Sequence, residues 1–409
     1  MHRIMVGMKR IYEAVIPEQF SQDQQMLFFV GPRQVGKTTI SLTSQSLNSH
    51  FLYLNWDNLD DRELMLQGPK AIFERLNLQP FSDERGTVVF DELHKYKKWK
   101  NFLKGFYDTY DKHVDILVTG SAKLNIYRVG SDSLMGRYFS YRVHPISVAE
   151  CVRTELIETE IAPPKEIEEE QWQRLLEFGG FPAPFLRADK RFATRWKSLA
   201  HEQLFRGDIR DLTNIQEINQ LEILAELLKQ QTGQLISYAS LANKVRVSLD
   251  TVRRWVTVLN TFYYGFSIKP WTKNVSRSLL KNPKFYLWDW SRVADPGARL
   301  ENFVAGHLLK AVHFWTDRGF GEFGLYFLRD KEQREVDFIV TKDKKPWFLV
   351  EVKSSKSAPL SESLRYYQEQ LKVPHAFQVV FDLPFIDRDC FSVKEPMIVP
   401  AKTFFSQLI

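Results

Sequence analysis

Residues 31–38, GPRQVGKT, fit the pattern G-x-x-x-x-G-K-[ST], in which each residue type has a role in holding phosphate. The glycines let the backbone curl so that its N–H groups face phosphate oxygens. Lys37 is placed to reach the β- and γ-phosphates, and Thr38 supplies a hydroxyl for Mg²⁺. An apolar run precedes this loop and a helix-compatible segment follows it, which argues against a chance glycine turn. The residues predicted to bind nucleotide are Gly31, Pro32, Arg33, Gln34, Val35, Gly36, Lys37, Thr38 and Thr39.

A second apolar run, Thr87 to Phe90, ends in the carboxylate pair Asp91 and Glu92. Asp91 is expected to hold the Mg²⁺ shell through water, and Glu92 to polarise the attacking water as general base. An acidic pair at this position favours ATP over GTP hydrolysis, and the sequence has no guanine-reading Asn-Lys-x-Asp. ATP and Mg²⁺ are therefore the predicted cofactors.

A third run, Ile116 to Thr119, continues into Gly-Ser-Ala. Ser121 is the candidate for orienting the lytic water or contacting the γ-phosphate, with Thr119 the second choice; an ordinary strand-to-loop turn explains the residues equally well. Arg137 is a candidate for stabilising charge on the γ-phosphoryl group, from its own or a neighbouring subunit. A lone arginine is otherwise most often a surface charge.

The segments FFVGPRQVGKTT, VVFDELHK, ILVTGSA and LMGRYFSYRVHPIS together resemble the AAA+ ATPase module of a widespread prokaryotic family with an uncharacterised C-terminal domain. The later segments GGFPAPF and RGDIRDL continue the resemblance, which covers essentially the whole chain. It implies an ATP-binding AAA+ core and a homo-oligomer, such as a ring. In such assemblies a neighbour's arginine completes each ATP site, and Arg137 matches a motif of the family.

Short apolar runs alternate with helical patterns in the first third of the chain, which predicts an α/β fold with a P-loop parallel sheet covered by helices on both faces. The pattern breaks near Pro163-Pro164, becomes mostly helical, and returns to strand-type alternation after Gly324. We therefore expect an ATPase domain at 1–160, a helical lid and winged-helix region at 161–275, and a nuclease-like α/β domain at 276–409.

The middle region contains a helix-turn-helix pattern. Ser237 and Ser248 are placed as N-caps of two short helices, and the second helix has apolar positions at helical spacing. Such a pair either packs against the ATPase core or presents its second helix to a DNA groove. The basic residues available for DNA contact are Lys244, Arg246, Arg253 and Arg254.

The last third places Asp337 on one expected strand and Glu351 and Lys353 on the next. Strand alternation puts Glu351 and Lys353 on one face, where two carboxylates and a lysine can hold Mg²⁺ and orient water toward a phosphodiester. This arrangement resembles the PD-(D/E)xK nuclease core, although Val336 replaces its leading proline. Glu301 on a preceding helix and Gln368 on a following helix complete the candidate site. The competing explanation is an ordinary ion pair on an exposed strand.

The chain has 409 residues, 44% of them apolar, with only two cysteines, a net charge of +6 and a pI near 9.0. No apolar stretch approaches the roughly 20 residues of a membrane span, so a cytoplasmic enzyme is expected. The leading hypothesis is an oligomeric ATPase that acts on DNA by binding, translocation or remodelling, with or without cleavage by its C-terminal domain. The alternative is a nucleotide-dependent switch that binds a protein partner through an inactive nuclease-like domain.

Overall fold

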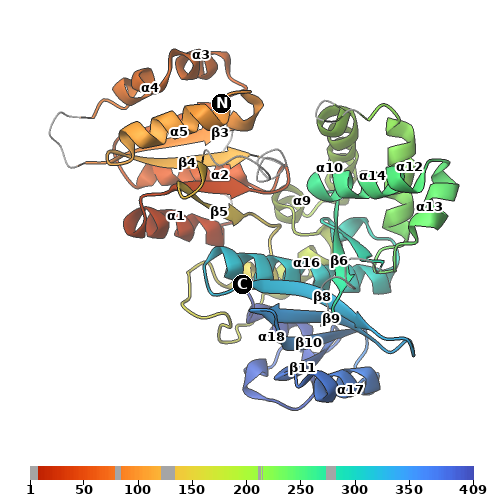
Figure 1. Cartoon of the computed structure of the whole chain (residues 1–409). Helices are drawn as coiled ribbons and strands as arrows, with labels where there is room; N and C mark the ends of the chain where they lie inside the picture. The colour runs from red at the N-terminus through yellow and green to blue at the C-terminus, as the bar shows by residue number, and fades with distance from the viewer. Residues whose placement is uncertain (1–7, 79–83, 121–133, 211–212, 214, 273–281) are drawn as a thin grey trace. The chain divides into compact units, whose positions relative to one another are not determined.

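A computed structural model describes residues 8–78, 84–120, 134–210, 213, 215–272 and 282–409 (Figure 1). They form two compact units. The first comprises the chain up to His144 together with Thr154–Leu156, and the second comprises Pro145–Arg153 and Ile157–Ile409. None of the helices in the described part combines the length and apolar character needed to cross a bilayer.

The first unit is built on a five-stranded sheet with the order β2-β3-β4-β1-β5, in which all neighbouring strands are parallel. This confirms the expected α/β class. The apolar runs before the phosphate loop, at residues 87–90 and at residues 116–119 lie within two residues of observed strands, whereas the strand at Tyr138–Arg142 was not predicted. The strands are β1 Met26–Val30, β2 Phe51–Asn55, β3 Gly86–Asp91, β4 Val114–Gly120 and β5 Tyr138–Arg142. The helices are α1 Ile11–Gln22, α2 Lys37–Leu42, α3 Leu59–Gln67, α4 Pro69–Arg75 and α5 Trp99–Tyr110.

Strand β1 is buried along its whole length, because helices cover both faces of the sheet (Figure 1). On one face, Phe28 belongs to a core that also contains Leu103 and Phe106 of α5. On the other face, the ring of Phe29 meets Tyr12 of α1 edge-on, with 6.3 Å between the ring centres. A parallel strand that is buried on both faces has a continuous run of apolar residues. The sequence therefore predicted β1 correctly.

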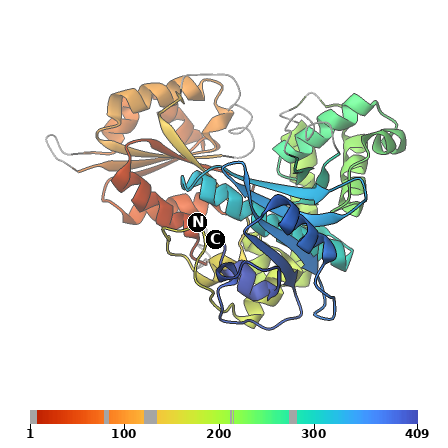
Figure 2. The ribbon, with the colours of Figure 1, turned by 60° about the horizontal axis from the view of Figure 1, so that its bottom comes forward.

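The second unit contains a seven-stranded mixed sheet with the order β12-β11-β10-β9-β8-β6-β7 (Figure 2). Its strands are β6 Gly265–Pro270, β7 Lys284–Leu287, β8 Phe323–Arg329, β9 Glu335–Lys342, β10 Lys345–Lys353, β11 His375–Val380 and β12 Met397–Pro400. Its helices are α7 Val148–Val152, α8 Glu169–Phe178, α9 Pro182–Arg187, α10 Lys190–Glu202, a π-helical stretch Gln203–Ile209, α12 Ile218–Gln230, α13 Tyr238–Val245, α14 Leu249–Thr261, α16 Pro296–Asp317, α17 Glu362–Leu371 and α18 Ala401–Ser406.

Strand β6 changes the expected domain division. It pairs antiparallel with β7 and parallel with β8, so a strand from the region 161–275, expected to be a lid and winged helix, is part of the large sheet. The regions 161–275 and 276–409, which the sequence suggested as two domains, therefore fold as one compact unit. The first boundary also lies earlier than residue 160, because the chain enters the second unit at Pro145.

Helices α13 and α14 form where the sequence predicted them. The hydroxyl oxygens of Ser237 and Ser248 cap the two helices by accepting bonds from the N–H groups of Ser240 and Thr251. The apolar residues of α14 are buried, as expected from their spacing. These buried residues are Val252, Trp255, Val256 and Leu259.

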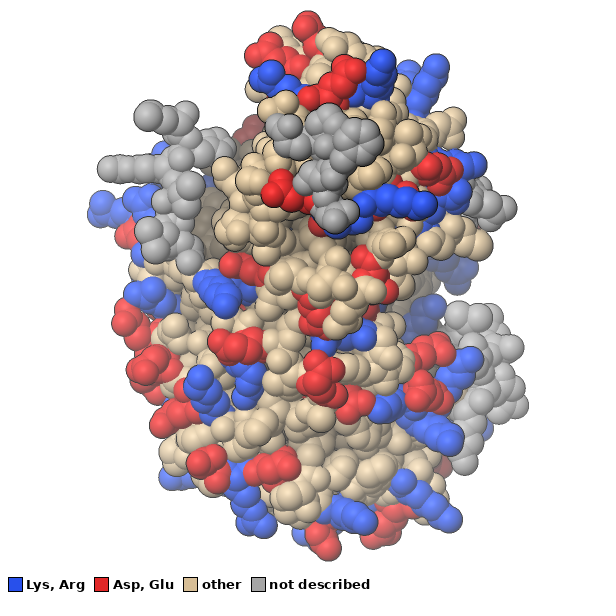
Figure 3. Space-filling view, turned by 90° about the vertical axis from the view of Figure 1, so that its left-hand side faces the viewer, with Lys and Arg blue, Asp and Glu red and all other residues tan. Residues whose placement is uncertain are grey.

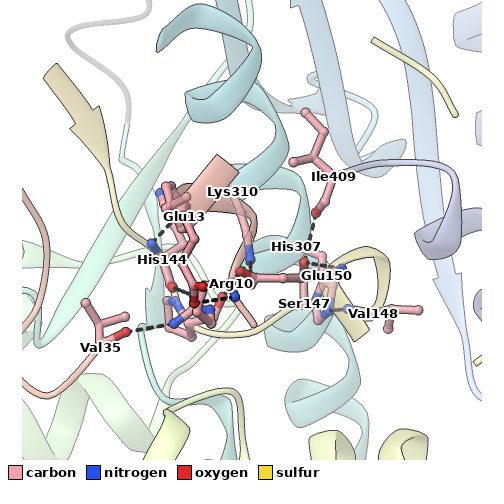
Figure 4. A network of polar contacts seen from close by, with 12 residues as sticks. Arg10, Glu13, Val35, His144, Ser147, Val148, Glu150, His307, Lys310 and Ile409 are labelled. Atoms are coloured by element: carbon pink, nitrogen blue, oxygen red, sulfur yellow. Dashed lines mark hydrogen bonds and ion pairs between the residues drawn. The ribbon is translucent and has the colours of Figure 1, made fainter. Parts of the chain in front are cut away.

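Residues 145–153 are fixed within the second unit by buried polar contacts (Figure 4). Lys310 of α16 donates to Glu150 at 2.5 Å and to the carbonyl of Pro145 at 3.0 Å. Val148 N–H donates to Nε2 of His307, which places the imidazole proton on Nδ1, facing the carbonyl of Phe303. Burial lowers the pKa of His307 to about 3, so this contact uses the neutral ring.

Candidate functional site

The phosphate loop joins β1 to α2, and two of its glycines are required by its shape. Gly36 adopts φ 98°, a left-handed conformation that glycine reaches without strain. A Cβ atom on Gly31 would lie 2.4 Å from the carbonyl oxygen of Val143 at the end of β5. Any side chain at position 31 would therefore push the loop away from the sheet.

Arg10 supports this loop, a role that no sequence motif indicated. It is 4% exposed, and its guanidinium donates to the carbonyl oxygens of Val35 at 2.8 Å and His144 at 2.7 Å (Figure 4). Arg10 lies at the N-cap of α1, and only the fold brings it to the loop. These two bonds fix the backbone of the loop against the end of the first unit's sheet.

Lys37 is 7% exposed and folds back onto its own loop. Its ammonium donates to the carbonyl oxygens of Gly31 at 3.0 Å and Pro32 at 2.6 Å. Both of these acceptors are neutral. A phosphate oxygen is a stronger acceptor for an ammonium group than a carbonyl, and it can replace them.

Asp91 ends β3 and accepts hydrogen bonds from three hydroxyls. Thr38 and Tyr53 each donate to Oδ2 at 2.7 Å, and Thr119 donates to Oδ1. Burial raises the pKa of Tyr53, and the nearby charge of Asp91 raises it further, so the phenol remains a donor. Thr119, the second choice at the tip of β4, thus contacts the metal-site aspartate directly; Ser121, the first choice, lies outside the described residues.

These residues fit a magnesium ion. The hydroxyl of Thr38 and the carboxylate of Asp91 face each other at 2.7 Å, and both are oxygen ligands of the kind that Mg²⁺ prefers. The other partners of Asp91 are neutral hydroxyls, which water molecules of a metal shell can replace. The sequence predicted these two residues as metal ligands, and the structure brings them together.

Glu92 follows β3 in a left-handed conformation, with φ 56°. Its Oε2 lies 3.1 Å from the ammonium of Lys95, which also pairs with Asp57 at 2.5 Å. Burial alone would lower the pKa of Lys95, but the bond to Asp57 and the charge of Glu92 raise it. The predicted general base is therefore held by a cation in this structure.

Arg137 does not lie at the phosphate loop of its own subunit. Its carbonyl accepts from the N–H of Met26 at the start of β1, whereas the loop follows Val30 at the far end, roughly 13 Å along the strand. Its guanidinium pairs instead with Asp108 of α5, at 2.7 Å. Of the two alternatives, its own site or that of a neighbouring subunit, this position argues against its own site.

The second unit brings together most of the residues predicted for a nuclease-like site. Lys353 donates to Oε1 of Glu351 at 2.8 Å, which confirms that they share one strand face. Asp337 accepts from the N–H of Val352 at 2.8 Å. Burial raises the pKa of Asp337 well above its usual value, and the charges of Glu301 and Glu351 raise it further. The three acids therefore converge from α16, β9 and β10.

Gln368 does not face these acids. Its side-chain amide donates to the carbonyl oxygens of Val373 at 3.3 Å and Lys394 at 2.6 Å. It holds the chain that follows α17, so the prediction that it joins the site is wrong. A helical position alone could not show that these backbone acceptors lie nearer than the acids.

Sequence reasoning missed two residues of the cluster, Lys284 and Glu335. Lys284, which begins β7 and is 3% exposed, lies 3.2 Å from Glu301 and 2.6 Å from Glu335. Its Nζ is also 4.0 Å from Asp337. Within the described residues, no group of three His, Cys, Asp or Glu side chains is arranged to hold a metal ion. The ammonium of Lys284 lies against three of the acids, so this cluster does not fit a divalent cation as it stands.

Helix α14 carries exposed basic residues beside its buried apolar face. Arg253 and Arg254 are exposed on α14, Lys244 is exposed near the end of α13, and Arg246 is exposed in the turn between the two helices. The guanidinium of Arg253 lies over the ring of Tyr238, 5.6 Å from its centre. In the view of Figure 3, Lys and Arg are interspersed with Asp and Glu among the described residues. The surface drawn there shows no extended patch of one charge.

Comparisons with known proteins agree with the geometry of the first unit. Residues 23–152 match the family described as "AAA domain", while residues 169–294 and 296–383 match two families described only as domains of unknown function. The phosphate loop, Asp91 and Glu92 lie inside the first match. The first unit is therefore a P-loop ATPase domain of the AAA type.

Relatives extend over most of the chain. A protein from Haemophilus influenzae, named only as uncharacterized, is 21% identical over 364 residues, covering 84% of this chain and 85% of the relative. A Mycobacterium tuberculosis protein, also named as uncharacterized, is 22% identical over 355 residues, covering 83% and 73%. These names add no activity, so the later regions must be interpreted from their own residues.

Two solved structures match the chain at low overall similarity. An Aeropyrum pernix ORC1 protein in complex with DNA has a TM-score of 0.30 at 11% identity, covering 72% of this chain and 90% of its own. A RuvB variant from Thermotoga maritima has a TM-score of 0.30 at 17% identity, covering 66% and 92%. The ATPase class rests on the matched residues 23–152 and on the site itself.

Proposed function

We propose that the chain is an oligomeric Mg²⁺-dependent ATP hydrolase that acts on DNA. The observation that carries the ATPase part is the contact of Asp91 with both Thr38 and Thr119, beside a lysine that donates to carbonyls of the phosphate loop. Nucleotide phosphates would replace those carbonyls as partners of Lys37. Thr38 and Asp91 would hold Mg²⁺, which supplies charge neutralisation on the phosphates.

The general base must be released before hydrolysis. Glu92 can accept a proton from water only when its carboxylate faces the γ-phosphate, and in this structure it pairs with Lys95. Binding of ATP and closure of a subunit interface would therefore be accompanied by a change of partner at Glu92. Arg137, turned to the opposite edge of its own sheet, would serve a neighbouring subunit if it contacts phosphate at all.

The DNA part of the proposal is supported by α13 and α14. A buried apolar face fixes α14 in the unit, while Arg253 and Arg254 remain exposed for phosphate or base contacts. Tyr238 orders the guanidinium of Arg253, which reduces the entropy lost on binding.

Filter binding of duplex DNA to the full chain across a tenfold range of salt concentration tests this proposal. We expect the logarithm of affinity to fall linearly with the logarithm of salt concentration, and DNA to raise the ATPase rate. The double variant Arg253→Ala, Arg254→Ala should lower affinity about tenfold and reduce the salt slope by about two. The DNA-free ATPase rate should not change.

The matched control removes two exposed lysines elsewhere in the second unit, Lys344→Ala with Lys345→Ala, and should keep most of the affinity. Absence of DNA binding, or binding without a salt slope, would reject the DNA proposal. A protein partner recovered in stoichiometric amount, with DNA leaving the ATPase rate unchanged, would favour the nucleotide-dependent switch instead.

A further inference from the structure

Lys284 lies against three members of an acidic cluster formed by Glu301, Glu335, Asp337 and Glu351. Its Nζ lies 2.6 Å from Glu335, 3.2 Å from Glu301 and 4.0 Å from Asp337. These three acids come from α16 and from neighbouring positions of β9. A single ammonium group thus contacts carboxylates from two elements, as a bound metal ion would.

The backbone around Lys284 is held on both sides. It pairs with Ile268 of β6 and forms a further bridge with Leu235. The ring of Phe327 lies 5.5 Å from Nζ, and the phenol of Tyr286 donates to Glu301 at 2.7 Å. The side chain of Lys284 is therefore buried among these groups.

Two of the acids, Glu335 and Glu351, also pair with other cations. Arg329 pairs with Glu335 at 2.8 Å, and Lys353 pairs with Oε1 of Glu351 at 2.8 Å. Within the described residues, three cations thus face four carboxyl groups, and the raised pKa of Asp337 favours its neutral form. Oε2 of Glu351 is buried and has no hydrogen-bond partner in the described part of the chain. A divalent cation needs several oxygen ligands, and Lys284 already lies against two of these acids, Glu301 and Asp337.

We propose that Lys284 is an internal cation that takes the place of a metal ion in this cluster. The second unit then neither binds a divalent cation there nor cleaves DNA while Lys284 stays in position. Removal of the ammonium would open a divalent-cation site among Glu301, Asp337 and Glu351. This inference depends neither on ATP hydrolysis nor on action on DNA.

The test titrates the nucleotide-free full chain with Mn²⁺ and counts free ions by electron paramagnetic resonance. Lys284→Met keeps the length and apolar stem of the side chain but removes its charge. We expect this variant to gain one Mn²⁺ site. Its Mn²⁺ affinity should be at least about tenfold higher than that of the same cluster in the wild type. The gain should disappear in Lys284→Met, Asp337→Asn, and Mn²⁺ should raise the Tm of the single variant but not of the wild type.

Lys284→Arg is the matched control, since it retains the positive charge and should gain no site. Cooperative urea unfolding followed by tryptophan fluorescence, compared with the wild type, shows whether the variants are folded. A folded Lys284→Met chain that gains no Mn²⁺ site would overturn the proposal.

A second experiment keeps Lys284 and therefore does not require the Lys284 variants to fold. Asp337→Asn in the wild-type background should leave both Mn²⁺ binding and any DNA cleavage unchanged. If it lowers either of them, the cluster already works with metal and the proposal is wrong.

Discussion

The ATP site of the first unit and the acidic cluster of the second unit use similar residues with opposite results. Each has carboxylates carried by strands of a sheet and contains a buried lysine. At the ATP site, Lys37 donates to backbone carbonyls, and Asp91 accepts from neutral hydroxyls. In the acidic cluster, Lys284 is bound to the carboxylates themselves.

The difference shows that the partners of a carboxylate matter more than its presence. Hydroxyls around Asp91 can be replaced by the water shell of Mg²⁺ without separating opposite charges. The ammonium of Lys284 can be replaced only by moving a buried charge, which is costly. We therefore expect one site to depend on added ligands and the other to be complete without them.

The largest effect is expected from Lys37→Ala, because a chain that does not hold ATP loses turnover as well as affinity. It removes the cation of the phosphate loop motif that is placed to meet the β- and γ-phosphates. Nucleotide affinity should fall at least about thirtyfold, as expected for truncating one member of a buried charged pair. Calorimetric titration with a non-hydrolysable ATP analogue measures this, with Lys97→Ala as the exposed-lysine control. Retained affinity would show that Lys37 stays on its carbonyls when nucleotide binds.

Glu92→Gln should separate binding from chemistry. The amide cannot accept a proton from water, so kcat should fall by about 100-fold or more while ATP remains bound. Single-turnover kinetics with labelled ATP distinguishes the two steps, and Glu74→Gln on the surface of α4 is the control. Unchanged turnover would mean that another group activates the water, and the resemblance of this site to other ATPases would then be incomplete.

Asp337→Asn should have the smallest effect and a distinct pH dependence. The folded-state pKa of Asp337 is raised, whereas the unfolded chain loses this proton near pH ~4. Between those pKa values the native state binds more protons than the unfolded state, so wild-type stability declines as pH rises, by at most about 1.4 kcal/mol per pH unit.

Asp337→Asn removes that decline. The unfolding free energy of the variant minus that of the wild type should therefore increase as pH rises above about 4. Urea unfolding followed by tryptophan fluorescence measures it, with Asp387→Asn as the exposed control. A difference that stays constant with pH would show that Asp337 is ionised in the folded chain, and would weaken the contrast with Asp91.

The ATP site was largely predictable from sequence because its parts are local. A phosphate loop needs its glycines, lysine and threonine within about eight residues, and a buried parallel strand marks itself as an apolar run. Asp91 and Glu92 follow such a run directly. The N-caps Ser237 and Ser248 were equally visible, since a cap and its helix are adjacent in the chain.

The parts that escaped prediction depend on contacts between distant segments. Arg10 and Lys284 carry no motif, and each obtains its role only when strand order brings it to a site. The strand order also removed Arg137 from its own ATP site and joined β6 to the large sheet. Strand order depends on contacts along the whole chain, and a local sequence motif does not reveal it.

The path of the chain between the two units has a consequence for how this protein can be divided. The chain passes from one unit to the other three times, at residues 144–145, 153–154 and 156–157. A fragment cut at residue 160 would keep Glu150 but lose Lys310, leaving a carboxylate and an apolar helix without their partners. No single cut yields two complete units, so we expect a fragment that ends at residue 160 to be less stable than the full chain.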